Sequence, residues 1–144
     1  MILPDVNVLV YAHRVEAPEH ERYRAWWRAT VEAPAPFALS DLVAVGLVRI
    51  VTNRRIWSTP TPTDLALEFI AAIRERRNCR AVQPGPDNWE IFSELVRVTS
   101  AAGKLVADAH HAAVAIEHGC ELLTADSDFA RFPGLRVRHP LGIA

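Results

Sequence analysis

The segment Cys120-Glu121-Leu122-Leu123-Thr124-Ala125-Asp126-Ser127-Asp128 decides the fold class. Residues 120–124 form a short run in which Glu121 is the only charge, which is typical of a buried strand. Shorter runs at residues 2–3, 79–82 and 135–137 predict three further strands. Helical apolar spacing fills the stretches between them. Short strands alternating with helices predict an α/β fold of three layers, in which a short parallel sheet is flanked by helices.

The expected helices are recognised by the residues that begin and end them. Ala17-Pro18 opens one, and Ser40-Asp41 begins a second that runs over residues 42–51. Thr61 is the expected N-cap of a third, with Pro62 in its first turn and an end near residue 77. Two more are expected from Gly85-Pro86 to a stop at Gly103, and over residues 108–118.

Length and composition place further bounds on the protein. The 144 residues suit a single domain over residues 1–144. No apolar run approaches the roughly 20 residues of a membrane span, and no signal peptide is visible, so we expect a cytoplasmic protein without membrane contact. The net charge is -1, although 15 of the 16 basic residues are arginine. Arginine suits phosphate groups, but codon usage explains its excess equally well.

Acidic residues stand where a parallel sheet binds its ligands. Asp5 follows the first expected strand, Asp108 begins the expected helix over residues 108–118, and Asp126 and Asp128 follow residue 124. Ligands bind at the carboxyl ends of such strands. Several carboxylates in one crevice repel each other unless a cation joins them, and their oxygens suit Mg²⁺ or Mn²⁺. Taken singly, each aspartate reads equally well as a helix cap or part of a polar turn.

Three segments resemble a known family in sequence and in order. Asp5-x-Asn7-Val-Leu-Val-Tyr, Asp108-Ala-His and Leu123-Thr124-x-Asp126-x-Asp128-Phe129 are similar to segments of the PIN-domain ribonucleases, and among them of VapC-type toxins. The resemblance covers essentially the whole chain. It implies a parallel sheet between helices, an acidic pocket for Mg²⁺ or Mn²⁺, and endonucleolytic cleavage of RNA. It also implies a homodimer and a cognate VapB-type antitoxin that blocks the pocket.

The resemblance assigns a role to each matching position. Asp5 and Asp108 would be the primary metal ligands, and Asp126 would complete the pocket. Asp128 would be a peripheral carboxylate of the catalytic site. The remaining candidates are two groups that would orient the carboxylates, Asn7 and Thr124, and two arginines near the pocket that would contact RNA phosphates, Arg14 and Arg49.

One position departs from the family pattern. A glutamate usually stands three residues before the arginine of the central helix, whereas Gly46 stands three residues before Arg49 here. Glycine inside a helix costs about 1 kcal/mol relative to alanine, so Gly46 suggests close packing or access. Asp41 is the nearest acid, but at five residues from Gly46 it faces about 140° away on a helix.

Two other functions stay open at this point. A catalytically weak or dead PIN domain would only bind RNA and its antitoxin, and Gly46 supports that alternative. A phosphatase with Asp5 as nucleophile would need an aspartate two residues later as general acid, and Asn7 cannot fill that role.

Overall fold

The computed structural model describes residues 1–142 and contains a five-stranded sheet. All neighbouring strands are parallel, and their order is β3-β2-β1-β4-β5. The strands are β1 (Ile2–Pro4), β2 (Phe37–Ser40), β3 (Cys79–Val82), β4 (Glu121–Leu123) and β5 (Arg136–Arg138). The predicted short parallel sheet is therefore confirmed.

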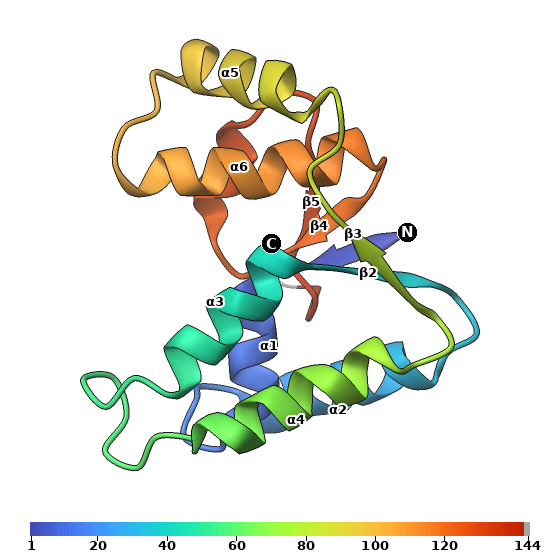
Figure 1. The fold of residues 1–144 in the computed structure, drawn as a ribbon, viewed down its shortest axis with the longest axis vertical. Coiled ribbons are helices and arrows are strands. Elements are labelled where there is room, and N and C mark those ends of the chain that lie inside the picture. The colour runs from blue at the N-terminus through green and yellow to red at the C-terminus, as the bar shows by residue number, and fades with distance from the viewer. Residues whose placement is uncertain (143–144) are drawn as a thin grey trace.

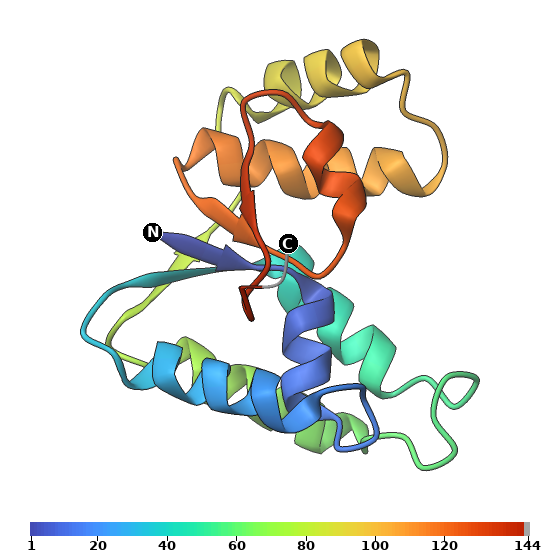
Figure 2. The same ribbon diagram turned by 180° about the vertical axis from the view of Figure 1, so that it is seen from behind.

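Helices cover both faces of this sheet. Figures 1 and 2 show α5, α6 and the short 3₁₀ helix η1 on one face and α1 to α4 on the other. Their bounds are α1 (Val6–His13), α2 (His20–Glu32), α3 (Asp41–Val51), α4 (Thr63–Arg74), α5 (Asn88–Thr99), α6 (Lys104–Glu117) and η1 (Ser127–Arg131). This arrangement is the expected three-layer fold. No helix within residues 1–142 is both long and apolar enough to cross a bilayer.

The central strands contribute side chains to two separate cores. Phe37 and Leu39 of β2 pack into the core beneath α1 to α4, whereas Ala38 packs into the core beneath α5 and α6. Leu3 of β1 belongs to the second core as well. Successive side chains of a strand point to opposite faces, so a short strand buried on both faces needs apolar residues throughout.

The strand order reverses its direction at β1. The chain moves from β1 to β2 and β3 in one direction and then returns across the sheet to β4 on the other side of β1. Leu3 and Pro4 pair with Leu122 and Leu123, and the amide of Asp5 donates to the carbonyl of Leu123 at 2.9 Å. Such a switch point is where open α/β sheets bind ligands. Asp5 and the residues after β4 both lie there.

The strand β2 was not predicted from the sequence. Its four residues follow two prolines and run directly into the Ser40 cap of α3, so they give little strand signal. Asn78, a buried side chain, holds the segment before β2. Its Nδ2 lies 2.8 to 3.2 Å from the carbonyls of Thr30, Ala33 and Ala35. The strand therefore depends on tertiary contacts with residue 78.

Two helix boundaries differ from the prediction. The third helix begins at Thr63, not after a Thr61 cap, because the Thr61 hydroxyl is bound by His13 and Arg14 instead. Gly103 does not end α5, which stops at Thr99. With a φ of 59° Gly103 turns the chain into α6, which begins at Lys104. Asp108 was expected at a helix N-terminus, but it lies in the second turn of α6.

Gly46 marks the close approach of α3 to α1. A Cβ atom built at Gly46 would lie 2.8 Å from Cγ2 of Val6, which is buried. Valine is stiff at χ1 and cannot move aside without shifting its neighbours. The close packing expected at Gly46 is confirmed, and it occurs at the residue that follows Asp5.

We predict that Gly46→Ala destabilises the protein although alanine favours a helix by about 1 kcal/mol. The overlap with Val6 should exceed that gain, because overpacking costs about 1–3 kcal/mol. In a Val6→Ala background the same change should stabilise. Urea unfolding of the four proteins measures the coupling, which should be about 1 kcal/mol or more. An equal effect in both backgrounds would contradict the packing explanation.

Candidate active site

The Asp5 carboxylate is buried where β1 becomes α1. It caps the helix, because Oδ1 accepts the amide of Val6 at 2.7 Å. Its second oxygen, Oδ2, accepts the Thr124 hydroxyl at 2.7 Å. The residue is 6% exposed. Asp5 is thus a helix cap, as the simpler interpretation held, but it is also a buried charge at the switch point of the sheet.

The Thr124 hydroxyl joins the two sequence segments of the site. It donates to Asp5, and it accepts the side-chain amide of Asn7 at 3.3 Å and the backbone amide of Asp126 at 3.0 Å. The Asn7 carbonyl oxygen in turn accepts the amide of Ala125 at 3.3 Å. Thr124 therefore contacts Asp5 directly, whereas Asn7 is linked to the aspartates only through Thr124 and the backbone at Ala125.

A lysine bridges the other two carboxylates. The Lys104 ammonium donates to Oδ2 of Asp108 at 3.1 Å and to Oδ2 of Asp126 at 2.9 Å. Asp108 comes from α6, whereas Asp126 precedes η1 and accepts the amide of Asp128 on its Oδ1. Asp128 itself is about half exposed and faces Arg131 at 3.9 Å. The structure thus brings Asp108 and Asp126 together and leaves Asp128 at the periphery.

These charges shift the pKa values of the site in different directions. Burial raises the pKa of Asp5, with a contribution from the charge of Asp108, and the Thr124 and Val6 hydrogen bonds do not cancel it. Partial burial also opposes ionisation of Asp126. The amide of Asp128 and the Lys104 ammonium outweigh that burial and hold the pKa of Asp126 below its ordinary value. Hydrogen bonds to Asp126 and Asp108 raise the pKa of Lys104.

Two neighbours of the aspartates were not assigned to the site from the sequence. Lys104 precedes the helix that the sequence predicts over residues 108–118, whereas in the structure it is the first residue of α6. The second neighbour is His111. It is half-buried close to Asp5 and Asp108, and burial lowers its pKa against the opposing effect of those charges. Lys104 and Asp108 are four residues apart, a spacing that brings two side chains into contact on a helix, and this spacing could have indicated their ion pair from the sequence.

The two arginines expected to contact phosphate have different surroundings. The Arg14 guanidinium is buried, donates to Thr61, Glu16 and the carbonyl of Thr59, and lies 4.5 Å above the ring of Trp57. It ties the loop after α3 to the end of α1, so the expected phosphate contact of Arg14 is replaced by a structural role. Arg49 is exposed on α3. Asp41, considered as a replacement for the missing glutamate, is exposed and pairs with Arg74 at 3.2 Å.

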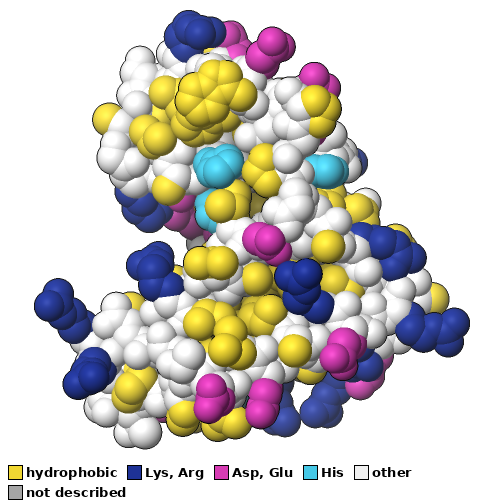
Figure 3. Space-filling model, viewed as in Figure 1, with side chains coloured by type: hydrophobic (Ala, Val, Ile, Leu, Met, Phe, Trp, Pro, Cys, Tyr) yellow, Lys and Arg dark blue, Asp and Glu magenta, His cyan; other side chains and the backbone are white. Residues whose placement is uncertain are grey.

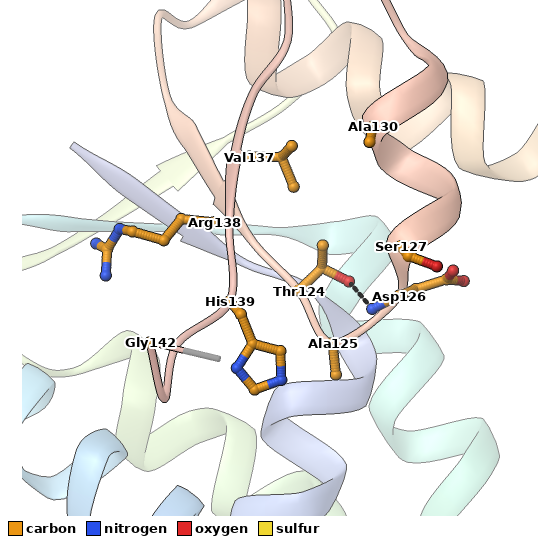
Figure 4. Close-up of a pocket in the computed structure, with 9 residues that line it drawn as sticks. All are labelled: Thr124, Ala125, Asp126, Ser127, Ala130, Val137, Arg138, His139 and Gly142. Atoms are coloured by element: carbon orange, nitrogen blue, oxygen red, sulfur yellow. Dashed lines mark hydrogen bonds between the residues drawn. The ribbon is translucent and has the colours of Figure 1, made fainter. Parts of the chain in front are cut away.

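The molecule is hollowed between its two helical layers. Figure 3 shows this notch between the layer of α5 and α6 and the layer of α3, with histidine and acidic side chains in its depth and basic side chains on its rims. A separate cavity of 660 Å³ adjoins Thr124 and Asp126 on the side of β5. Figure 4 shows Val137 and His139 on its wall and the Asp126 carboxylate directed away from them.

The donor atoms of the site fit a hard divalent cation. They are carboxylate oxygens, which Mg²⁺ and Mn²⁺ prefer. A cation already bridges Asp108 and Asp126 in the form of the Lys104 ammonium. Within residues 1–142 no three His, Cys, Asp or Glu side chains are gathered into a ready-made metal cage. In the arrangement described, the three aspartates do not form such a cage.

Solved structures with this fold include toxin–antitoxin proteins. VapBC2 of Rickettsia felis, bound to a DNA fragment from its promoter, superposes with a TM-score of 0.70 and 19% identity over 96% of this chain and 98% of that one. VapC20 of Mycobacterium tuberculosis, described as a toxin that cleaves the sarcin–ricin loop, gives 0.66 and 21% identity over 94% and 99% of the two chains. At these identities the likeness shows the fold.

Sequence comparison identifies the family. Residues 2–135 match the PIN domain. A VapC ribonuclease of Mycobacterium bovis is 41% identical over 141 residues, which are 98% of this chain and 96% of that protein. Ribonuclease VapC25 of Mycobacterium tuberculosis is 37% identical over 142 residues, which are 98% of this chain and 100% of that protein. The chain therefore belongs to the PIN-domain family, and within it to the group that contains these VapC ribonucleases.

Proposed function

We propose that this protein is the toxin of a toxin–antitoxin pair and cleaves RNA endonucleolytically with Mg²⁺ or Mn²⁺. Its relatives are named VapC ribonucleases at 34–41% identity. The observation that carries the proposal is the buried Asp5 carboxylate, whose pKa is raised by burial and by the charge of Asp108. Burying a charge is costly unless a partner of opposite charge accompanies it, and within residues 1–142 no salt bridge reaches Asp5. A divalent ion would supply that partner.

Asp5, Asp108 and Asp126 would hold the ion, which when bound polarises the phosphodiester and makes a water molecule a better nucleophile. The chain's own residues position these carboxylates. Thr124 orients Asp5 and, through the amide of Asp126, the start of η1. Asn7 fixes the Thr124 hydroxyl and the backbone at Ala125. Asp128 stays at the rim of the site and needs no contact with the ion.

RNA and a cognate VapB-type antitoxin are the proposed partners. The notch between the helical layers is open to a polymer, and basic side chains on its rims suit phosphate groups. We assign Arg49, which is exposed, to such a contact. Structures of this fold include FitAB and VapBC complexes, which supports an antitoxin and a homodimeric toxin. The cytoplasmic location stays a prediction from the sequence.

A PIN domain that binds RNA without cleaving it is the second candidate, and Gly46 is the observation in its favour. The close contact of Gly46 with Val6 leaves no room there for the family's usual glutamate, and Asp41 is paired elsewhere. A phosphatase is not proposed, because Asn7 is an amide committed to Thr124 and Ala125.

The cleavage test compares wild type with Asp5→Asn and Asp108→Asn on structured and single-stranded RNA. We expect wild type to cleave with Mg²⁺ or Mn²⁺ and not with EDTA. Both variants should lose more activity than the about 10- to 100-fold expected for a residue that only supports a ligand. A Thr124→Val variant should fall in that smaller range, because it leaves all three carboxylates in place.

Asp64→Asn is the matched control, since Asp64 is exposed in the first turn of α4. It should cleave as wild type does. Equal cleavage by all proteins would reveal a contaminating nuclease. If RNA is bound by every protein but cut by none with either metal, the binding-only function is correct and the nuclease is refuted.

A second prediction follows from the raised pKa of Asp5. A raised pKa means that the folded carboxyl holds its proton longer, so wild type loses stability as pH rises from about 4 through that pKa. Asp5→Asn lacks this loss. In EDTA, the unfolding free energy of the variant minus that of wild type should therefore increase from pH 4 to pH 7, with a slope of at most about 1.4 kcal/mol per pH unit.

Chemical unfolding at several pH values measures this difference. Asp64→Asn should show a constant difference from wild type over the same range. Saturating Mg²⁺ should raise the stability of wild type, because it binds only the folded site. A difference between Asp5→Asn and wild type that does not change with pH would contradict the cost of the buried charge.

A further inference from the structure

Lys104 is the single lysine of the chain, and its ammonium lies between two carboxylates of the proposed metal site. The distances are 3.1 Å to Asp108 and 2.9 Å to Asp126. Fifteen other basic residues are arginines, none of which pairs with either carboxylate in the described residues. The basic group between these carboxylates is therefore a compact, rotatable ammonium, whereas every other basic side chain of the sequence ends in a planar guanidinium.

The position of Lys104 does not serve the helix that carries it. It is the first residue of α6, where the helix dipole disfavours a positive charge. It also precedes Asp108 by four residues, which is the less favourable order for an ion pair along a helix. The contact with Asp126, which lies outside α6, is thus the contact that helix stability does not explain.

The Lys104 ammonium is easily displaced. Its side chain is 70% exposed, while those of Asp108 and Asp126 are 12% and 26% exposed. Asp126 also accepts the amide of Asp128, whereas the four-carbon stem of lysine can turn towards water. An exposed ion pair contributes little stability. A divalent ion should therefore bind the same two carboxylate oxygens more strongly than the Lys104 ammonium does.

We propose that Lys104 is a built-in competitor of the divalent ion, joining Asp108 to Asp126 in the metal-free protein and leaving them when the ion binds. This inference rests on the proposed function, because it concerns the same metal site. Lys104 is then a positioning residue. It holds α6 and the start of η1 together without metal, and it raises the metal concentration at which the site fills.

The first test measures Mg²⁺ and Mn²⁺ binding to the purified protein by calorimetry, without RNA. Lys104→Met should bind either ion about 2- to 30-fold more tightly than wild type, the range that corresponds to removing two exposed ion pairs. Arg131→Met is the matched control. It removes a positive charge 3.9 Å from Asp128 and leaves Asp108 and Asp126 untouched, so its affinity should change by less than about twofold.

The second test uses the unaltered sequence and therefore does not depend on the folding of a variant. Lysine labelled with ¹³C gives one side-chain Cε signal, because Lys104 is the only lysine. Mg²⁺ should move that signal to the position it has in unfolded protein, with the same midpoint as the calorimetric titration. A signal that stays in place while the ion saturates the site would overturn the proposal.

The outcomes distinguish a failure of competition by Lys104 from a failure of the proposed metal site. Equal affinity in wild type and Lys104→Met, or weaker binding in the variant, overturns competition by Lys104 and leaves the metal site standing. An equal increase of metal affinity in Lys104→Met and Arg131→Met would be explained by the loss of any nearby positive charge, and it also overturns the proposal. If neither ion binds wild type or Lys104→Met, the metal site and the competition by Lys104 fail together.

Discussion

A single hydroxyl group, that of Thr124, connects the parts of the molecule on which the site depends. It reaches Asp5 at the end of β1, Asn7 in α1 and the backbone that leads into η1. The pairing of β1 with β4 makes these contacts possible, since parallel strands end at the same edge of a sheet. Every donor and acceptor of the hydroxyl is used. The pairing of β1 with β4 therefore brings the segments of the site together, and the Thr124 side chain links them by hydrogen bonds.

Electrostatic balance differs between the two halves of the site. Asp5 is buried with neutral hydrogen-bond donors only, and its pKa is raised. Asp126 is more exposed and shares an ammonium with Asp108, and its pKa is lowered. One half thus has an uncompensated charge and the other has its own cation. This asymmetry is not expected of a group of solvated acids, and it supports the proposed ion site.

Much of the fold and of the candidate site could be predicted from short motifs. The strands β1, β3 and β4, the Ser40 cap and the convergence of Asp5, Thr124 and Asp126 follow from local pattern and from the rule on strand ends. β2 could not be predicted, because the contacts of Asn78 hold its approach. The burial of Arg14 could not be predicted, since Thr59 and Thr61, two of its partners, lie more than 40 residues away in sequence. Lys104 was missed because the start of α6 was placed at Asp108.

The position of β1 in the middle of the sheet has a consequence for how the protein is made. β4 is translated after β1, β2 and β3, although it pairs with β1. A chain released before residue 121 lacks β4, Thr124 and Asp126, whatever the state of its other helices. The site is therefore completed only after residue 126 has been translated, and no fragment of an interrupted translation that ends before residue 121 carries the assembled carboxylates.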